Sequence, residues 1–141
     1  MRGFPVDNFM GLRLAPDMLP FWRQVTIACD VAKAAAAAYA QIEAPKFDDN
    51  ETTVAQLHER IAATRAFLAS IPADAYAKTN DKSIVSVPFP RGKAMFAADA
   101  ALSRSVPNFF FHVSMAYALL RAGGVSIGKM DYLGELNLFD A

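Results

Sequence analysis

Apolar residues recur at steps of three and four along three long stretches of the chain, the spacing of one face of an α-helix. The first predicted helix runs from Asp17, its N-cap, to about Gln41, and Pro20 is tolerable in its first turn. An alanine run from Ala34 to Ala38 predicts a close neighbouring helix, because small side chains let two backbones approach. The apolar face of this helix consists of Met18, Trp22, Val25, Cys29, Ala32, Ala36 and Tyr39.

The second predicted helix begins at Thr53, where the segment Thr53–Gln56 fits a capping box, and Pro72 ends it. A loop with an acidic run precedes this helix, from Ala44 to Thr53. His58 lies beside the apolar face among charged neighbours, so we expect a solvated histidine there. The apolar face consists of Val54, Leu57, Ile61, Thr64, Leu68 and Ile71.

The third predicted helix covers Pro107 to Gly124 and is very apolar. Pro107 either starts this helix or kinks a longer one that begins near Ala98, and Gly123-Gly124 provides a left-handed stop. Three consecutive phenylalanines, Phe109–Phe111, surround the helix axis and predict burial on several sides. One stripe of this helix combines polar and apolar residues, namely Asn108, His112, Met115 and Leu119.

A small β-hairpin is predicted between the second and third helices, over Lys82 to Ala97. Its strand, turn and return strand are marked by Ile84, Val85 and Val87, by Pro90-Arg91-Gly92, and by Ala94–Phe96. The lead-in from Met1 to Pro16 and the tail after Gly124 have no regular pattern. The predicted fold is therefore mostly α, with three long helices of an antiparallel bundle, a type usually built from four, and a small β-hairpin insertion.

The composition indicates one globular domain over residues 1–141, with 54% hydrophobic and 20% charged residues. The formal net charge is zero and no basic run exceeds two residues, so neither nucleic acid nor a membrane is an expected partner. No stretch reaches ~18 uncharged apolar residues, and the N-terminus lacks a signal-peptide core. The single cysteine, Cys29, excludes an intrachain disulfide and predicts a buried thiol in a reducing cytoplasm.

The usual motifs for phosphate binding, nucleophilic catalysis and paired-histidine zinc binding are absent from the sequence. His112 is the main candidate for chemistry, because its stripe otherwise belongs to the core. We expect Asn108 and His112 to be buried, with a neutral His112 hydrogen-bonded to Asn108 or to a backbone carbonyl. The alternative is a metal site in which Asp30, the nearest carboxylate, joins His112. Asp30 also has an ordinary interpretation as the ion-pair partner of Lys33.

Three segments carry a resemblance to a known family: LRLAPDMLPFWRQVTIACDVAK (Leu12–Lys33), FDDNETTVAQLHERIAATRAFL (Phe47–Leu68) and VPNFFFHVSMAYALLRAGGVSIGKMDYLG (Val106–Gly134). They resemble a bacterial family of unknown function, domain-of-unknown-function family nineteen ninety-three. That family is grouped with the DinB/YfiT-like metalloenzymes, four-helix bundles with an up-down-down-up arrangement. The resemblance covers most of the chain in the right order and implies a DinB-like bundle.

Active DinB-like relatives typically use three histidines, one on the second bundle helix and two in an H-x-x-x-H motif on the last. Alignment on Leu120-Arg121 places His112 on the second histidine of that motif and Asn108 on the first. The remaining histidine falls near Cys29 or Asp30. The resemblance therefore implies a degenerate metal site formed by Asp30, Asn108 and His112. We expect this site to hold no cofactor; the alternative is that it binds a divalent metal ion, zinc or nickel.

The family usually has a further amphipathic helix before the L-A-P-D-M motif, whereas only Met1 to Gly11 precede that region here. Either the natural start lies upstream of Met1, or the chain fills the gap by pairing with itself. The gap leaves an apolar groove, and large exposed apolar patches are rare on soluble monomers. With zero net charge we expect a homodimer. The predicted walls of the groove are Trp22, Val25, Cys29, Val54, Leu57 and Ile61.

Two functional hypotheses follow. The first is a cytoplasmic structural or small-ligand-binding bundle with an unknown ligand, and the broken histidine triad favours it. The alternative is a divalent-metal-dependent enzyme of the DinB-like transferase type, with Asp30 and His112 on the ion.

Overall fold

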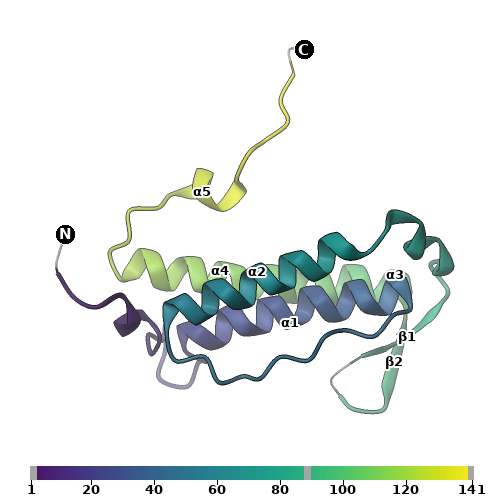
Figure 1. The fold of residues 1–141 in the computed structure, drawn as a ribbon, viewed down its shortest axis with the longest axis horizontal. Coiled ribbons are helices and arrows are strands. Elements are labelled where there is room, and N and C mark those ends of the chain that lie inside the picture. The colour runs from purple at the N-terminus through teal and green to yellow at the C-terminus, as the bar shows by residue number, and fades with distance from the viewer. Residues whose placement is uncertain (1–2, 88–89, 140–141) are drawn as a thin grey trace.

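Three long helices make up most of the structure, a computed structural model that describes residues 3–87 and 90–139. They are α1 (Phe21–Ala40), α2 (Val54–Ser70) and α4 (Val106–Ala122), and α1 packs against both of the others. Figure 1 shows α1 and α2 running in the same direction, because the loop between them returns along the bundle, while α4 runs the opposite way. This order agrees with the last three helices of the expected up-down-down-up bundle.

The start of α1 differs from the prediction, because Pro20 and not Asp17 is the N-cap and Phe21 is the first helical residue. A residue that precedes proline is disfavoured in the α region, so Leu19 does not continue a helix into Pro20. The predicted end of α1 is confirmed. Gln41 is the C-cap and adopts a left-handed conformation with φ 55°.

The second helix, α2, begins and ends as predicted. The Thr53 hydroxyl accepts a hydrogen bond from the Gln56 backbone N–H at 3.2 Å, and the Gln56 side chain accepts one from the Thr53 N–H at 3.1 Å, which completes the capping box. His58 is exposed, as expected. The 3₁₀ segment η2 (Ala73–Lys78) follows α2. The face of α2 that is buried against the bundle consists of Leu57, Arg60 and Thr64.

The predicted hairpin is confirmed as β1 (Ile84–Val87) and β2 (Lys93–Phe96), an antiparallel pair in which Val85 lies opposite Met95. Residues 88 and 89 lie outside the described residues. Val85 is buried in a small cluster beside the C-terminal end of α1. This contact places the hairpin next to one cavity of the bundle, described below.

A continuous helical segment leads from the hairpin into the last long helix, through α3 (Ala97–Asp99) and the π-helix η3 (Ala100–Ser105). Pro107 lies in the first turn of α4, but the dihedral angles on either side of the junction remain right-handed helical. Proline has no N–H and its ring crowds the carbonyl four residues earlier. The wide π turn before it accommodates the ring, and Pro107 lies at the N-terminal end of α4, as the first alternative predicted, although the helical backbone continues through the junction.

The N-terminal lead-in has more structure than its sequence pattern predicts. It contains the 3₁₀ segment η1 (Val6–Phe9), and Phe9 and Met10 are buried in the main core cluster. The lead-in therefore fills one end of the predicted groove, and three of its predicted walls pack against this core instead of lining an open groove. These three residues are Trp22, Val54 and Leu57.

Two other expectations need correction at the C-terminal side. Phe110 and Phe111 are 49% and 51% exposed, so the outer side of α4 is not covered as predicted. The tail contains the short helix α5 (Lys129–Leu133), whose Tyr132 hydroxyl lies 3.1 Å from the Ser114 hydroxyl of α4. Beyond α5 the chain extends away from the helices (Figure 1). Within residues 3–87 and 90–139, no helix is long and apolar enough to cross a membrane.

Candidate functional site

Two cavities open next to the contact between α1 and α4. The first, of about 410 Å³, lies among α1, β1, η3 and α4 and is called the side pocket. The second, of about 390 Å³, lies among α1, α2 and α4 and is called the apolar groove. Asp30 and Asn108 both line the side pocket, whereas His112 lines the apolar groove. The structure therefore brings two of the three predicted ligand residues to one cavity and the third to another.

His112 is buried, as predicted, but its partner is neither Asn108 nor a backbone carbonyl. Its Nδ1 atom lies 2.7 Å from Oε1 of Gln24, which is 2% exposed. An amide oxygen only accepts hydrogen bonds, so Nδ1 carries the proton. Burial, with a smaller effect from the charge of Arg23, lowers the pKa of His112. The ring is therefore neutral, and Nε2 is its acceptor.

Asn108 is half-buried, so the expectation of a fully buried Asn108–His112 pair is wrong. The two residues share one face of α4, but α1 crosses this face and separates their surroundings. Spacing along one helix cannot show where a neighbouring helix crosses it.

The carboxylate of Asp30 is held by two cations. Its Oδ1 atom lies 2.9 Å from Nζ of Lys33, as the ion-pair interpretation predicted, and 2.7 Å from Nη2 of Arg60. The Arg60 side chain is only 3% exposed and also pairs with Asp49 at 3.2 Å and Glu51 at 2.8 Å. Burial alone would lower the pKa of Arg60, but the carboxylates around it raise that pKa overall.

These residues do not fit the metal of active DinB-like proteins. Asp30 and His112 line different cavities, and the Asp30 carboxylate is already paired with the two cations Lys33 and Arg60. Within the described part of the chain, no three histidine, cysteine or acidic residues gather in a group able to hold a metal ion.

Among residues 3–87 and 90–139, the apolar groove is lined by α1, α2 and α4 alone, and no described residue of the lead-in or the tail closes it. Val25, Cys29 and Ile61 belong to its lining, which confirms half of the predicted walls. Cys29 is a buried free cysteine, as expected. Burial raises the pKa of the Cys29 thiol, although a hydrogen bond with Thr64 acts in the opposite direction. A thiol in this state is a weak nucleophile.

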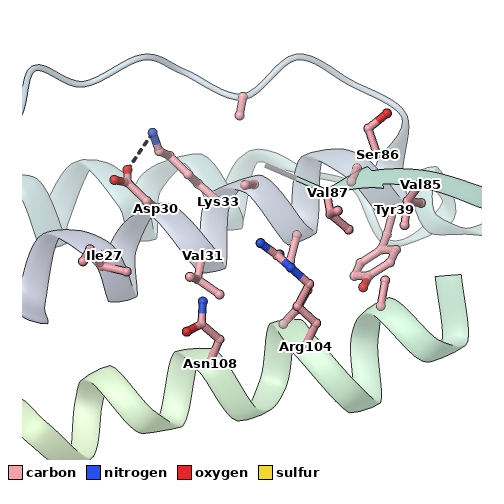
Figure 2. Close-up of a pocket in the computed structure, with 16 residues that line it drawn as sticks. Ile27, Asp30, Val31, Lys33, Tyr39, Val85, Ser86, Val87, Arg104 and Asn108 are labelled. Carbon is pink, nitrogen blue, oxygen red and sulfur yellow. Dashed lines mark ion pairs between the residues drawn. The ribbon is translucent and has the colours of Figure 1, made fainter. Parts of the chain in front are cut away.

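The side pocket combines apolar walls with a few polar groups. Figure 2 shows Arg104 and Asn108 projecting from one helical segment toward α1, and Tyr39 extending from α1 in the opposite direction. The Tyr39 hydroxyl is buried without a hydrogen-bond partner among the described residues. Three alanines of the predicted close-contact run, Ala34, Ala35 and Ala38, line the pocket. At these positions the small side chains leave space for a cavity.

Sequence reasoning missed four residues that define these surroundings, namely Gln24, Tyr39, Arg60 and Arg104. Tyr39 was assigned to the apolar face of its helix, and the others carried no motif. A signal did exist for Arg60, because it lies on α2 between Leu57 and Thr64, one position before the predicted apolar face residue Ile61. A charged residue beside a core face, after an acidic loop, indicates a buried ion pair.

The parallel α1–α2 pair with an antiparallel α4 defines this protein as a DinB-like helical bundle. It is similar to a DinB family member protein from Shewanella denitrificans, whose crystal structure matches with a TM-score of 0.87 and 39% sequence identity, over 96% of this chain and 76% of that chain. Residues 1–133 match the family described as Domain of unknown function (DUF1993), and the chain belongs to that family. A comparison with curated proteins found no match.

Proposed function

We propose that this protein is a small-ligand-binding bundle that holds its ligand in the side pocket without a metal ion. The observation that carries the proposal is the pocket itself, which has about 410 Å³ of space, apolar walls and a few converging polar side chains. Cavities of this size and character are the usual sites of small-molecule binding. The Tyr39 hydroxyl, which has no hydrogen-bond partner among the residues that the structure describes, supports the proposal, because buried polar groups normally find a partner.

The rival function, a divalent-metal-dependent enzyme, has less support. It needs Asp30 and His112 on one ion, yet they line different cavities and each already has side-chain partners. A catalytic zinc site normally has three protein ligands.

We also propose that two copies of the chain associate through the apolar groove, and that the protein acts in the cytoplasm. The groove is lined mainly by apolar side chains of three helices, and Ile61 at its edge is 36% exposed. Apolar surface of this kind is stabilised by removal from water. The zero net charge leaves no long-range repulsion between copies.

A ligand screen with a pocket-filling variant tests the proposed function. Small molecules would be screened by NMR against the wild type and against Ala35→Leu, whose larger side chain occupies the side pocket. Ala63→Leu, at an exposed position of α2, is the matched control. We expect at least one saturable ligand that binds the wild type and Ala63→Leu but not Ala35→Leu. A ligand set that binds all three proteins equally would place binding outside the side pocket and contradict the proposal.

A further inference from the structure

The charged side chains of the side pocket already have partners within the protein. Figure 2 shows the ion pair between Asp30 and Lys33, and the same Asp30 oxygen lies 2.7 Å from Nη2 of Arg60. The Lys33 ammonium also donates a hydrogen bond to the Pro45 carbonyl at 3.0 Å. Arg104, the other cation that lines the pocket, likewise has an interaction partner. An ionic ligand would therefore have to compete with contacts that the protein has already formed.

The other polar side chains that line the pocket are uncharged, namely Tyr39, Ser86, Ser105 and Asn108. Asn108 is the one best placed to meet a ligand. Figure 2 shows its amide directed toward α1, next to Val31. Among residues 3–87 and 90–139, this amide has no hydrogen-bond partner. The Ser105 hydroxyl lies one turn earlier on the same helical segment and lines the same pocket. The pocket therefore offers a ligand neutral hydrogen-bonding groups.

The Asn108 amide selects for a ligand group that both donates and accepts hydrogen bonds. It carries one carbonyl oxygen and one NH₂ group, so a carboxamide on a ligand can meet both at once. A carboxylate only accepts and an ammonium only donates, so either ion would leave one end of the Asn108 amide unmatched. Either ion would also lose its hydration in a cavity whose charges are already paired, which is costly.

The remaining walls indicate what accompanies the amide group. The pocket is lined from α1 and β1 by the branched apolar side chains of Ile27, Val31, Val85 and Val87. Such walls suit a hydrocarbon chain or ring. We propose that the side pocket binds a small uncharged carboxamide with an apolar body, whose amide group pairs with the side chain of Asn108. This inference rests on the proposed function of the same pocket and adds the class of ligand.

The test compares three six-carbon probes, hexanamide, hexanoate and hexylammonium, by NMR titration of the full chain. We expect hexanamide to bind at least about tenfold more tightly than either ion. Asn108→Leu, which nearly keeps the shape of the side chain, should remove this preference by weakening hexanamide binding. Asn137→Leu, at an exposed position of the tail, is the matched control and should keep it. Asn108→Asp should favour hexylammonium instead, because its carboxylate only accepts hydrogen bonds and carries a negative charge.

The outcomes separate this inference from the function on which it rests. Equal binding of the three probes, or tighter binding of an ion, would overturn the preference for an amide. If Ala35→Leu abolishes that binding, the ligand-binding function still stands. Hexanamide binding that is unchanged in Asn108→Leu would also overturn the inference. If no probe binds, the inference fails, and the proposed function fails with it only if the broader screen yields no ligand blocked by Ala35→Leu. If Asn108→Leu does not fold, the preference of Asn108→Asp between hexanamide and hexylammonium decides.

Discussion

The Nδ1 atom of His112 lies 2.7 Å from the Oε1 atom of Gln24, across the contact between α4 and α1. The Gln24 amide nitrogen in turn donates to the Leu19 carbonyl at 2.9 Å, so a chain of two hydrogen bonds connects α4 to the segment before α1. Both side chains are buried, at 8% and 2% exposure. The pair therefore orients the two helices, and it fixes the His112 tautomer with the proton on Nδ1.

The neutral state of His112 makes stability depend on pH. Its pKa is lowered from 6.5 in the folded protein, so below this value the unfolded chain binds a proton that the folded chain does not. The free energy of unfolding should therefore be at its full value above about pH 6.5, and fall as the pH drops toward the folded pKa. Urea denaturation across this range measures the slope. We expect His112→Gln to flatten it and His58→Gln, at an exposed position, to preserve it. If stability fell equally steeply with pH in all three proteins, His112 would not be the cause of the pH dependence.

Removal of the His112 ring should be costly because it leaves its partner unpaired. We expect His112→Ala to lower the free energy of unfolding by about 1–3 kcal/mol, from the unsatisfied Gln24 oxygen and the cavity left behind. The double variant Gln24→Leu/His112→Leu should be more stable than the sum of the two single changes predicts, because it removes both polar partners together. Chemical denaturation of the four proteins checks this. Strict additivity would show that the two side chains do not interact.

Titration with zinc and nickel should show no tight site in the wild-type protein. The carboxylate of Asp30 is paired with two cations and His112 faces another cavity, so an ion would have to break existing contacts. Calorimetry on protein purified without a histidine tag is the measurement. A one-to-one site of micromolar or better affinity that disappears in His112→Ala would favour the metal-dependent enzyme instead.

The oligomeric state should respond to a charge placed in the apolar groove. We expect light scattering to report a dimer at micromolar concentration and Ile61→Glu to shift it to a monomer, because an interface between two copies would have to take a carboxylate out of water, which is costly even with Arg65 one turn away. Leu102→Glu is the control, since Leu102 is 74% exposed on η3 and does not line the groove. A monomeric wild type, or equal effects of both substitutions, would show that two copies do not associate through the apolar groove.

The sequence predicted the helices better than it predicted the cavities, for a physical reason. Helix boundaries depend on local chemistry, such as the capping box at Thr53 and the left-handed Gly124, whose φ is 93°. The one wrong boundary, at Asp17, came from underestimating how Pro20 constrains the residue before it. The cavities depend on which side chains meet across helices, and partners such as Gln24 and His112 are 88 residues apart.

In the candidate site, too, the sequence predicted which residues are buried better than which side chains meet. Periodicity correctly predicted that His112 is buried, but the crossing of α1 over α4 decides that Asn108 belongs to a different cavity. Likewise the apolar pattern marked the groove, but it could not show that Phe9 and Met10 fill one end, because the lead-in has no helical period.

Arg60 makes the contact of α1 with α2 chemically different from the contact of α1 with α4. Its guanidinium, on α2, pairs with Asp30 of α1 and with Asp49 and Glu51 of the acidic loop, so charge pairs help to hold α2 and this loop against α1. Burial alone would raise the pKa of Asp49, but Arg23 and Arg60 lower it overall, so its stabilising contribution is lost as the pH falls below about 3.8 and toward the folded value. The contact between α1 and α4 depends on the neutral ring of His112, whose stabilising contribution is lost as the pH falls below about 6.5 toward the folded pKa. The two contacts of α1 should therefore weaken in different pH ranges, the contact with α4 below about pH 6.5 and the contact with the loop before α2 below about pH 3.8, and amide hydrogen exchange during acidification would show them opening separately.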